Sequence, residues 1–291
     1  MDLSASENIS VGDFIGKWKL IKKIAKSGFN DIYLGRFQTI DAVIKIPKSE
    51  EFWDKIDNEI QCLTYLENKF TFFPHILDRY TSNDPVPWLA LEIIEGENLK
   101  QFIENKGPLD KKEWFHLAEK LFKALSILDS KGITHEDIKP TNVFYNAGDL
   151  KIIDFGLARL PNLVSSKLND DSSVIDSWAG TFEFSSPEHF SGEHVSAMDV
   201  FSAASTLVFV GSGRSPFHAS SSSEWMNAIG RDAPNFQNLA DTQIRFLNPL
   251  FAKNKSERQT SLECVNFLNK FNESGILSSS PLFKIWPEIK N

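Results

Sequence analysis

Residues suited to phosphoryl chemistry gather in one short stretch of the sequence, ITHEDIKPTNVFY at 133–145. Asp137, Lys139 and Asn142 lie there, and Asp154 follows in KIIDFG. Phosphoryl transfer needs a carboxylate to orient the attacking hydroxyl, oxygen ligands for Mg²⁺ on the nucleotide phosphates, and a cation for the transferred group. Asp137 suits the first task, Asn142 and Asp154 the second, and Lys139 the third. The protein performs little covalent chemistry in such a reaction, so the rate depends on placement.

The elements that must position these residues begin with a β-rich part. One helix is predicted there, over 49–68, because its apolar residues fall on one helical face, and Ser49 is its candidate N-terminal cap. Alternating apolar residues bounded by turn signals predict strands around that helix. The strand-like runs are 17–25, 30–37, 41–47, 75–82 and 88–94.

Helical patterning dominates after Gly96, where the character of the sequence changes. One helical run closes at Gly132, as a C-terminal glycine should. The longest apolar stretch, VFSAASTLVFVG, is too short and too rich in small residues to span a bilayer, so it predicts a buried core helix. The predicted helices are 98–105, 111–132 and 200–211, and two strand-like pieces interrupt them at 142–146 and 150–155.

Composition limits the class of protein and its partners. The 291 residues carry 31 basic and 39 acidic side chains, a formal net charge of −8. We therefore expect neither nucleic acid nor an anionic membrane as partner, because both require a basic face. The chain has two cysteines, Cys62 and Cys264, which favours a reducing compartment over a disulfide framework. Its first residues lack the basic-then-apolar pattern of a signal peptide, and we expect a cytoplasmic location.

Taken together, in this order and at these intervals, the motifs resemble those of the eukaryotic-type protein kinases. HEDIKPTN resembles the family's His-Arg-Asp-Leu-Lys-Pro-x-Asn catalytic loop, and DFG at 154–156 resembles its magnesium loop. SPE at 186–188 resembles the Ala-Pro-Glu motif that closes the activation segment. The resemblance runs from about residue 15 to 270, and Lys139 favours serine/threonine kinases over tyrosine kinases.

The resemblance implies an α+β class and the bilobal protein-kinase fold. Its N-lobe would be a small antiparallel β-rich lobe with one helix, and its C-lobe would be larger and mainly helical. ATP with Mg²⁺, or with Mn²⁺ in its place, would lie between the lobes, and a protein would be the substrate. The expected divisions are a flexible arm over 1–10 and a kinase domain over 11–291, with an N-lobe at about 11–92, a hinge at 92–97 and a C-lobe at about 98–291.

The same resemblance assigns roles to single residues. Asp137 and Lys139 would be catalytic, and Asn142 and Asp154 would bind the metal. Asp199 would brace the catalytic loop, Arg258 would pair with Glu188, and Leu91 would be the gatekeeper behind the hinge. The nucleotide would contact Ile24, Ala25, Ser27, Ile32, Val43, Lys45 (with Glu59 as its ion-pair partner), Glu92, Ile94, Asn142, Phe144 and Asp154.

The glycine-rich loop departs from the family pattern. Its three glycines and its valine fall on Ala25, Ser27, Asn30 and Ile32, and Gly28 stands at a position outside the pattern. Such glycines let backbone N–H groups approach the phosphates, so we expect reshaped nucleotide contacts. One alternative is a pseudokinase that acts as a scaffold or allosteric partner. A second is a small-molecule kinase, against which the Lys-Pro and Pro-Glu pairs argue.

Glu136 is the second departure, because many relatives carry arginine there. That arginine binds a phosphate on the activation segment, which a glutamate would repel. One hypothesis is that the segment is held without phosphorylation, through a bond from Glu136 to Arg159 or Lys151. The other is that Glu136 is a solvated charge with no role. The sequence leaves open whether 165–181 is phosphorylated, which protein is the substrate, and the oligomeric state.

His189 and His194 are the two histidines closest together in the sequence. They have no cysteine or third histidine nearby, so a structural zinc site is not expected. Cys62 is interpreted as a small buried thiol on the same helix as Glu59.

Overall fold

The computed structural model describes residues 9–161, 182–273 and 286. Two compact units divide the chain: unit 1 is Met1–Glu95 with Ile153–Ala158, and unit 2 is Gly96–Ile152 with Arg159–Asn291. The first boundary lies within 92–97, the predicted hinge. Most of the predicted N-terminal arm, and the segment 165–181 whose phosphorylation the sequence leaves open, lie outside the described residues.

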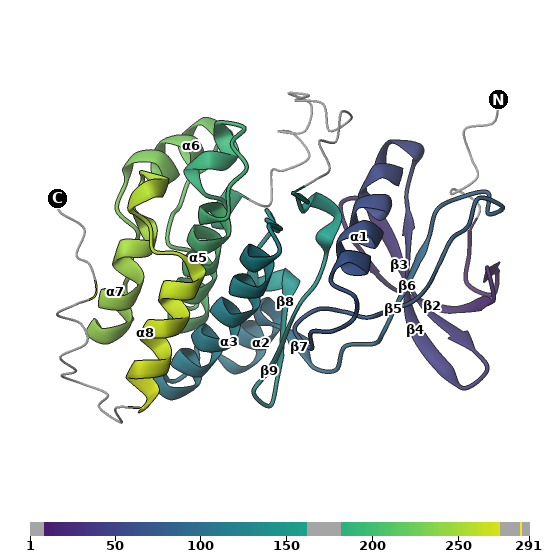
Figure 1. Ribbon diagram of the computed structural model, residues 1–291, viewed down its shortest axis with the longest axis horizontal. Helices are drawn as coiled ribbons and strands as arrows, with labels where there is room; N and C mark the ends of the chain where they lie inside the picture. The colour runs from purple at the N-terminus through teal and green to yellow at the C-terminus, as the bar shows by residue number, and fades with distance from the viewer. Residues whose placement is uncertain (1–8, 162–181, 274–285, 287–291) are drawn as a thin grey trace. The chain divides into compact units, whose positions relative to one another are not determined.

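Unit 1 is built on a six-stranded antiparallel sheet in the order β1-β2-β3-β4-β6-β5 (Figure 1). This confirms the strands predicted from apolar alternation. The helix predicted beside them is α1. The elements are β1 (Phe14–Ile15), β2 (Trp18–Lys26), β3 (Asn30–Phe37), β4 (Ile40–Pro47), α1 (Trp53–Tyr65), β5 (Ile76–Arg79) and β6 (Leu89–Leu91).

The expectation that Ser49 caps this helix is wrong. A short 3-10 helix, Glu50–Phe52, precedes α1, and the Ser49 side chain makes no capping bond to the backbone. Its hydroxyl instead donates to the Glu51 carboxylate at 3.0 Å. The acidic residue two positions later competes for the hydroxyl that a cap would need.

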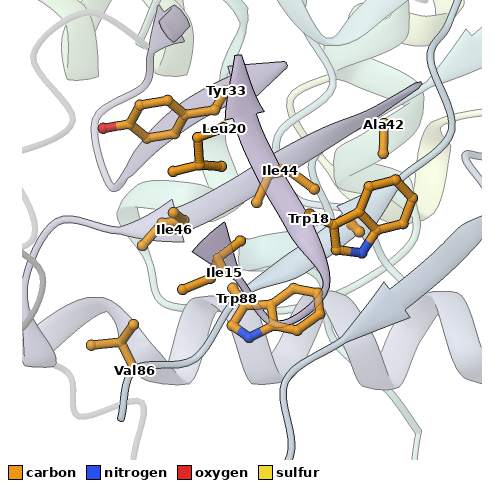
Figure 2. Packing of buried hydrophobic residues seen from close by; sticks show 10 residues of the cluster. Ile15, Trp18, Leu20, Tyr33, Ala42, Ile44, Ile46, Val86 and Trp88 are labelled. Carbon is orange, nitrogen blue, oxygen red and sulfur yellow. The ribbon is translucent and has the colours of Figure 1, made fainter. Parts of the chain in front are cut away.

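One hydrophobic core cluster of unit 1 lies on one face of the sheet, where two tryptophans meet branched aliphatic side chains (Figure 2). Directly paired residues share a face, so Tyr33 and Ile44 point into this core, whereas the neighbouring pair Ile32 and Lys45 lies on the opposite face. The alternation in AVIKIP thus buries isoleucines and directs one lysine away from them. The cluster consists of Ile15, Trp18, Leu20, Tyr33, Ala42, Ile44, Ile46, Val86, Trp88 and Ala90.

Unit 2 is mainly helical, with one three-stranded antiparallel sheet in the order β7-β8-β9. Its first two helices begin at side-chain caps: Asn98 accepts from the Gln101 N–H, and Asp110 accepts from the Glu113 N–H, both at 2.9 Å. The elements are β7 (Glu97–Asn98), α2 (Leu99–Lys106), α3 (Lys111–Ser130), β8 (Val143–Asn146), β9 (Asp149–Ile152), α5 (Ala197–Ser212), α6 (Ser222–Arg231), α7 (Asp241–Leu247) and α8 (Ser261–Glu273).

Helix α5 is the core helix of unit 2. Nearly all of its side chains are buried, which confirms the prediction from the apolar run at 200–211. Trp114 of α3 packs beside it and donates its indole N–H to the Leu207 carbonyl at 2.8 Å. Among the helices described, none has the length and apolar character that crossing a membrane requires.

Candidate active site

Lys45 is the centre of the polar cluster in unit 1. Its amine lies 2.7 Å from Glu59 Oε1 and 3.2 Å from Asp154 Oδ1, so the predicted ion pair with Glu59 is confirmed. Lys45 and Glu59 are 5% and 1% exposed. Burial alone would lower the pKa of Lys45, but the carboxylates of Asp154 and Glu59 outweigh burial and raise it. The amine therefore remains a cation in a dry environment.

Asp154 reaches this cluster because helix α1 binds the segment that follows it. The Asn58 side chain donates to the carbonyls of Phe155, Gly156 and Ala158 at 3.1, 3.2 and 2.7 Å. Phe155 is fully buried and packs edge-on against Phe73, with ring centroids 5.6 Å apart. Asp154 itself adopts a left-handed backbone, with φ of 73°. One helix thus carries both the carboxylate partner of Lys45 and the anchor of the Asp154 segment.

Asp137, Lys139 and Asn142 form the corresponding cluster in unit 2. Lys139 Nζ lies 2.8 Å from Asp137 Oδ1, and the Asn142 amide donates to Asp137 Oδ2 at 2.8 Å and to the Asp137 carbonyl at 2.9 Å. Pro140 opens the short 3-10 helix Pro140–Asn142, which brings Asn142 back toward Asp137. The structure therefore assembles two of the predicted residues, Lys139 and Asn142, around the Asp137 carboxylate.

The loop that holds Asp137 is braced by Asp199, in the first turn of α5. Its two carboxylate oxygens accept the N–H groups of His135 and Glu136 at 2.6 and 2.9 Å. Burial raises the pKa of Asp199 to about 7, even though these two hydrogen bonds favour the charged form. The bracing role predicted for Asp199 is confirmed.

The motif glutamate at 188 is also paired as predicted. Arg258 donates to both Glu188 oxygens, at 2.7 and 2.6 Å, and its side chain is fully buried. Further guanidinium N–H groups donate to the carbonyls of Ala252 and Ala197 at 2.7 and 3.0 Å. Burial alone would raise the pKa of Glu188, but Arg258 outweighs it and lowers that pKa.

A family model described as protein kinase domain matches residues 30–268. The chain belongs to the protein kinase domain family. With the β-rich composition of unit 1 and the helical composition of unit 2, this confirms the predicted α+β protein-kinase fold.

Two curated relatives of this kinase domain come from Thermomonospora curvata and Bacillus subtilis. It is 29% identical over 256 residues to a probable serine/threonine-protein kinase PkwA of Thermomonospora curvata, with 86% of this chain and 33% of that protein covered. It is 27% identical to serine/threonine-protein kinase PrkC of Bacillus subtilis strain 168, with 71% and 32% covered. The chain thus spans about a third of the length of these relatives.

A solved structure shares the fold of the kinase domain. Rad53 1–466 in complex with AMP-PNP superposes with a TM-score of 0.70 at 19% sequence identity. The match covers 86% of this chain and 64% of that chain. At this identity the match supports the fold alone.

Glu136 of the kinase domain is not a solvated charge, so that interpretation was wrong. Its side chain is 6% exposed and its backbone is left-handed, with φ of 64°. Arg159 Nε lies 3.6 Å from Glu136 Oε1, and Arg159 is one of the two bases predicted to pair with it. Paired backbone bonds between Thr134 and Arg159, at 2.7 and 3.1 Å, hold Arg159 beside the catalytic loop.

Two histidines contact Glu136 that sequence reasoning did not connect with it. His194 Nδ1 lies 2.8 Å from Glu136 Oε1, and His189 Nε2 lies 3.0 Å from the Glu136 carbonyl. The sequence signal for these contacts is the pair of histidines just after the SPE motif. From the sequence alone, that pair is considered only as possible metal ligands. Across the described residues no group of three or more His, Cys, Asp or Glu side chains is placed to hold a metal ion.

The predicted nucleotide-contact residues are divided between the units. Ile32 and Val43 are half-buried on the same sheet face as Lys45, because Ile32 pairs with Lys45 and Val43 stands two positions before it. Ile24 and Ala25 are exposed on β2. The other members in unit 1 are Ser27, in the turn after β2, and Glu92 and Ile94, after β6; Phe144 lies on β8 in unit 2.

The glycine-poor loop forms a tight turn between β2 and β3. The Ser27 N–H donates to the Asn30 carbonyl, and the Asn30 N–H donates to the Ser27 hydroxyl, both at 2.9 Å. The Lys48 amine donates to the carbonyls of Ser27 and Gly28, the latter at 3.2 Å. Phe29 packs on Phe52, with ring centroids 5.2 Å apart. Side chains thus fix a loop whose pattern glycines have been replaced.

Asn142 and Asp154, the residues predicted to bind the metal, each carry an oxygen atom of the kind that Mg²⁺ prefers. The Asn142 amide nitrogen is occupied by Asp137, which leaves the amide oxygen as the atom that would bind. The Asp154 side chain is 24% exposed and supplies carboxylate oxygens. Carboxylate and carbonyl oxygens are the ligands that this ion prefers.

Proposed function

We propose that the chain transfers the γ-phosphoryl group of Mg-ATP to serine or threonine hydroxyls of proteins. The observation that carries the proposal is the Asp137 carboxylate held between Lys139 and Asn142. The curated relatives PkwA and PrkC, which are named as serine/threonine kinases, support the choice of acceptor.

Each residue has a role set by its chemistry. Asp137 accepts a hydrogen bond from the substrate hydroxyl and aims its oxygen at the γ-phosphorus. Lys139 stabilises the charge on the transferred group, and Lys45, kept cationic by Glu59, orients the α- and β-phosphates. Asn142 and Asp154 would hold Mg²⁺, which neutralises charge on the phosphates when bound.

The activity does not depend on a phosphate bound at the catalytic loop. Support comes from Glu136, whose carboxylate already has Arg159 and His194 as partners and would repel a phosphate. A relative with arginine at this position needs an added anion to neutralise it. In this chain both charges of the pair, the Glu136 carboxylate and the Arg159 guanidinium, are side chains of the protein itself.

The second candidate is a pseudokinase that acts as a scaffold or allosteric partner. The turn between β2 and β3 favours it, because Ser27 and Asn30 replace glycines that would expose backbone N–H groups to phosphates. The two candidates differ in one observable, the transfer of the γ-phosphate.

Incubation of the purified chain with γ-labelled ATP, Mg²⁺ and a mixed protein acceptor tests the proposal. We expect label on serine or threonine with the wild type and with Asp149→Asn, an exposed carboxamide control. Asp137→Asn should lower the rate of label transfer by ~10³-fold or more, because the substrate hydroxyl is no longer oriented by a carboxylate. No label above Asp137→Asn with any acceptor would establish the pseudokinase instead.

A further inference from the structure

Two histidines in the segment after the SPE motif contact Glu136 of the catalytic loop. His194 meets the carboxylate, with Nδ1 2.8 Å from Oε1, and His189 meets the backbone carbonyl, with Nε2 at 3.0 Å. Both histidines and Glu136 belong to unit 2. One residue next to Asp137 is therefore bonded through its side chain and its main chain to one short segment.

The partners fix the protonation of the His194 ring. Arg159 Nη2 lies 3.2 Å from His194 Nε2, and a guanidinium can only donate, so Nε2 accepts. Nδ1 must then carry the proton that the Glu136 carboxylate accepts. The neutral Nδ1–H form of the imidazole satisfies both neighbours at once.

His189 is fixed in the opposite tautomer. The Ser186 N–H donates to Nδ1 at 2.9 Å, so this nitrogen accepts. Nε2 then carries the proton that the Glu136 carbonyl accepts. Burial lowers the pKa of His189, which favours the neutral ring that these bonds require.

The backbone conformation of Glu136 is unfavourable and must be held by its neighbours. A left-handed φ is unfavourable for a residue with a Cβ, and Glu136 adopts φ of 64°. Asp199 fixes this residue through its N–H group, while the histidines fix its carbonyl and carboxylate. The position of Asp137, the next residue, follows from these bonds.

We propose that His189 and His194 are positioning residues for phosphoryl transfer, which hold Asp137 in place through Glu136. They take over, from within the chain, the task that a phosphate and an arginine perform elsewhere in the family. This inference rests on the proposed kinase activity, since it assigns a role in that reaction.

Variants at the two histidines separate positioning from general stability. We expect His194→Ala and His189→Ala to lower kcat by ~10- to 100-fold, because a displacement of about 1 Å at a catalytic group costs that much. The KM for ATP should change less than ~2-fold, because the two histidines act on Asp137, which orients the substrate hydroxyl and not ATP. His218→Ala, at an exposed histidine of unit 2, is the matched control and should retain wild-type kcat.

Conservative variants that keep the hydrogen-bond donor distinguish positioning of Asp137 from a general contribution to stability. His194→Asn keeps a donor near the Nδ1 position, and His189→Gln keeps one near Nε2. We expect each to recover kcat to within ~3-fold of wild type. Equal losses in the alanine and conservative variants, or His194→Ala equal to His218→Ala, would overturn the inference.

Nitrogen NMR of the histidine rings in the wild-type chain tests the contacts if the alanine variants do not fold. We expect His194 as the Nδ1–H tautomer and His189 as the Nε2–H tautomer at neutral pH. The reverse assignment for either ring overturns the inference. An inactive wild type would refute the proposed function, whereas an active wild type with unaffected alanine variants would refute this inference alone.

Discussion

At the scale of the residue, Asp199 supports the catalytic loop because a carboxylate has two equivalent acceptors. It binds the N–H groups of His135 and Glu136 with one oxygen each. Asp199→Asn would retain the shape but turn an amide N–H₂ toward one of those donors. We expect a loss of about 1–3 kcal/mol in the free energy of unfolding, the cost of one unsatisfied buried group, and at least ~10-fold lower kcat. Urea unfolding and a phosphate-transfer assay measure the two effects.

The exposed Asp149→Asn variant is the control for Asp199, since it makes the same chemical change without burial. Removing the Asp199 charge also relieves its burial cost, which acts in the opposite direction. An asparagine variant as active as wild type would show that the two N–H bonds do not position the loop for catalysis, whatever its stability.

Single residues also show what the sequence could predict. The pairs Lys45–Glu59 and Arg258–Glu188 and the bracing by Asp199 followed from motif positions, and the structure confirms them. The burial of Glu136 did not follow, because its environment is made by His194, far along the chain. A charge is exposed or buried according to tertiary neighbours that local pattern does not encode.

At the scale of the element, α1 matters because two adjacent residues on it hold two different parts of the candidate site. Glu59 pairs with Lys45, and Asn58 holds the backbone after Asp154. Asn58→Ala would leave three carbonyls without this donor and loosen the Asp154 segment. We expect kcat/KM for ATP to fall ~10-fold, equivalent to about 1.4 kcal/mol, measured by steady-state kinetics at fixed Mg²⁺.

Gln61→Ala is the matched control for Asn58, because Gln61 is an exposed carboxamide on the same helix. It should leave kcat/KM within ~2-fold of wild type. If both variants behaved alike, the bonds from Asn58 would have no part in holding Asp154.

Elements with strong periodicity were predictable, and their junctions were not. The alternation in β3 and β4 and the apolar run of α5 gave their positions, since burial of one face or of a whole helix imposes a repeat on the sequence. The Ser49–Glu51 contact that replaces a cap, and the bonds by which Asn58 anchors the Asp154 segment, are individual side-chain hydrogen bonds. Such bonds leave no repeat, and those of Asn58 join residues that lie far apart in the sequence.

At the scale of the whole molecule, the residues proposed for phosphoryl transfer come from both units. Unit 1 carries Lys45, Glu59 and Asp154, and unit 2 carries Asp137, Lys139 and Asn142. The assignment of Asp154 to unit 1, although it follows Asp137 in the sequence, was not predictable from the order of motifs. Helix α1 of unit 1 binds this segment through the Asn58 side chain.

The stability of the folded chain should depend on pH through the buried pair Glu188 and Arg258. The pKa of Glu188 is lowered in the folded chain, so its contribution is present above the ordinary pKa of about 4.5 and is lost as pH falls below it. We expect the free energy of unfolding, measured in urea from pH 7 to pH 3, to decrease on the acidic side of this range. Glu188→Gln should start lower at pH 7 by about 3–5 kcal/mol, because the Arg258 charge is left buried without its partner. Its decrease on acidification should be smaller, since the titrating group is gone.

The control for this prediction is Glu183→Gln, at an exposed site, which should follow the wild-type curve. Parallel curves for Glu188→Gln and wild type between pH 5 and 3 would show that this pair does not govern the acid response.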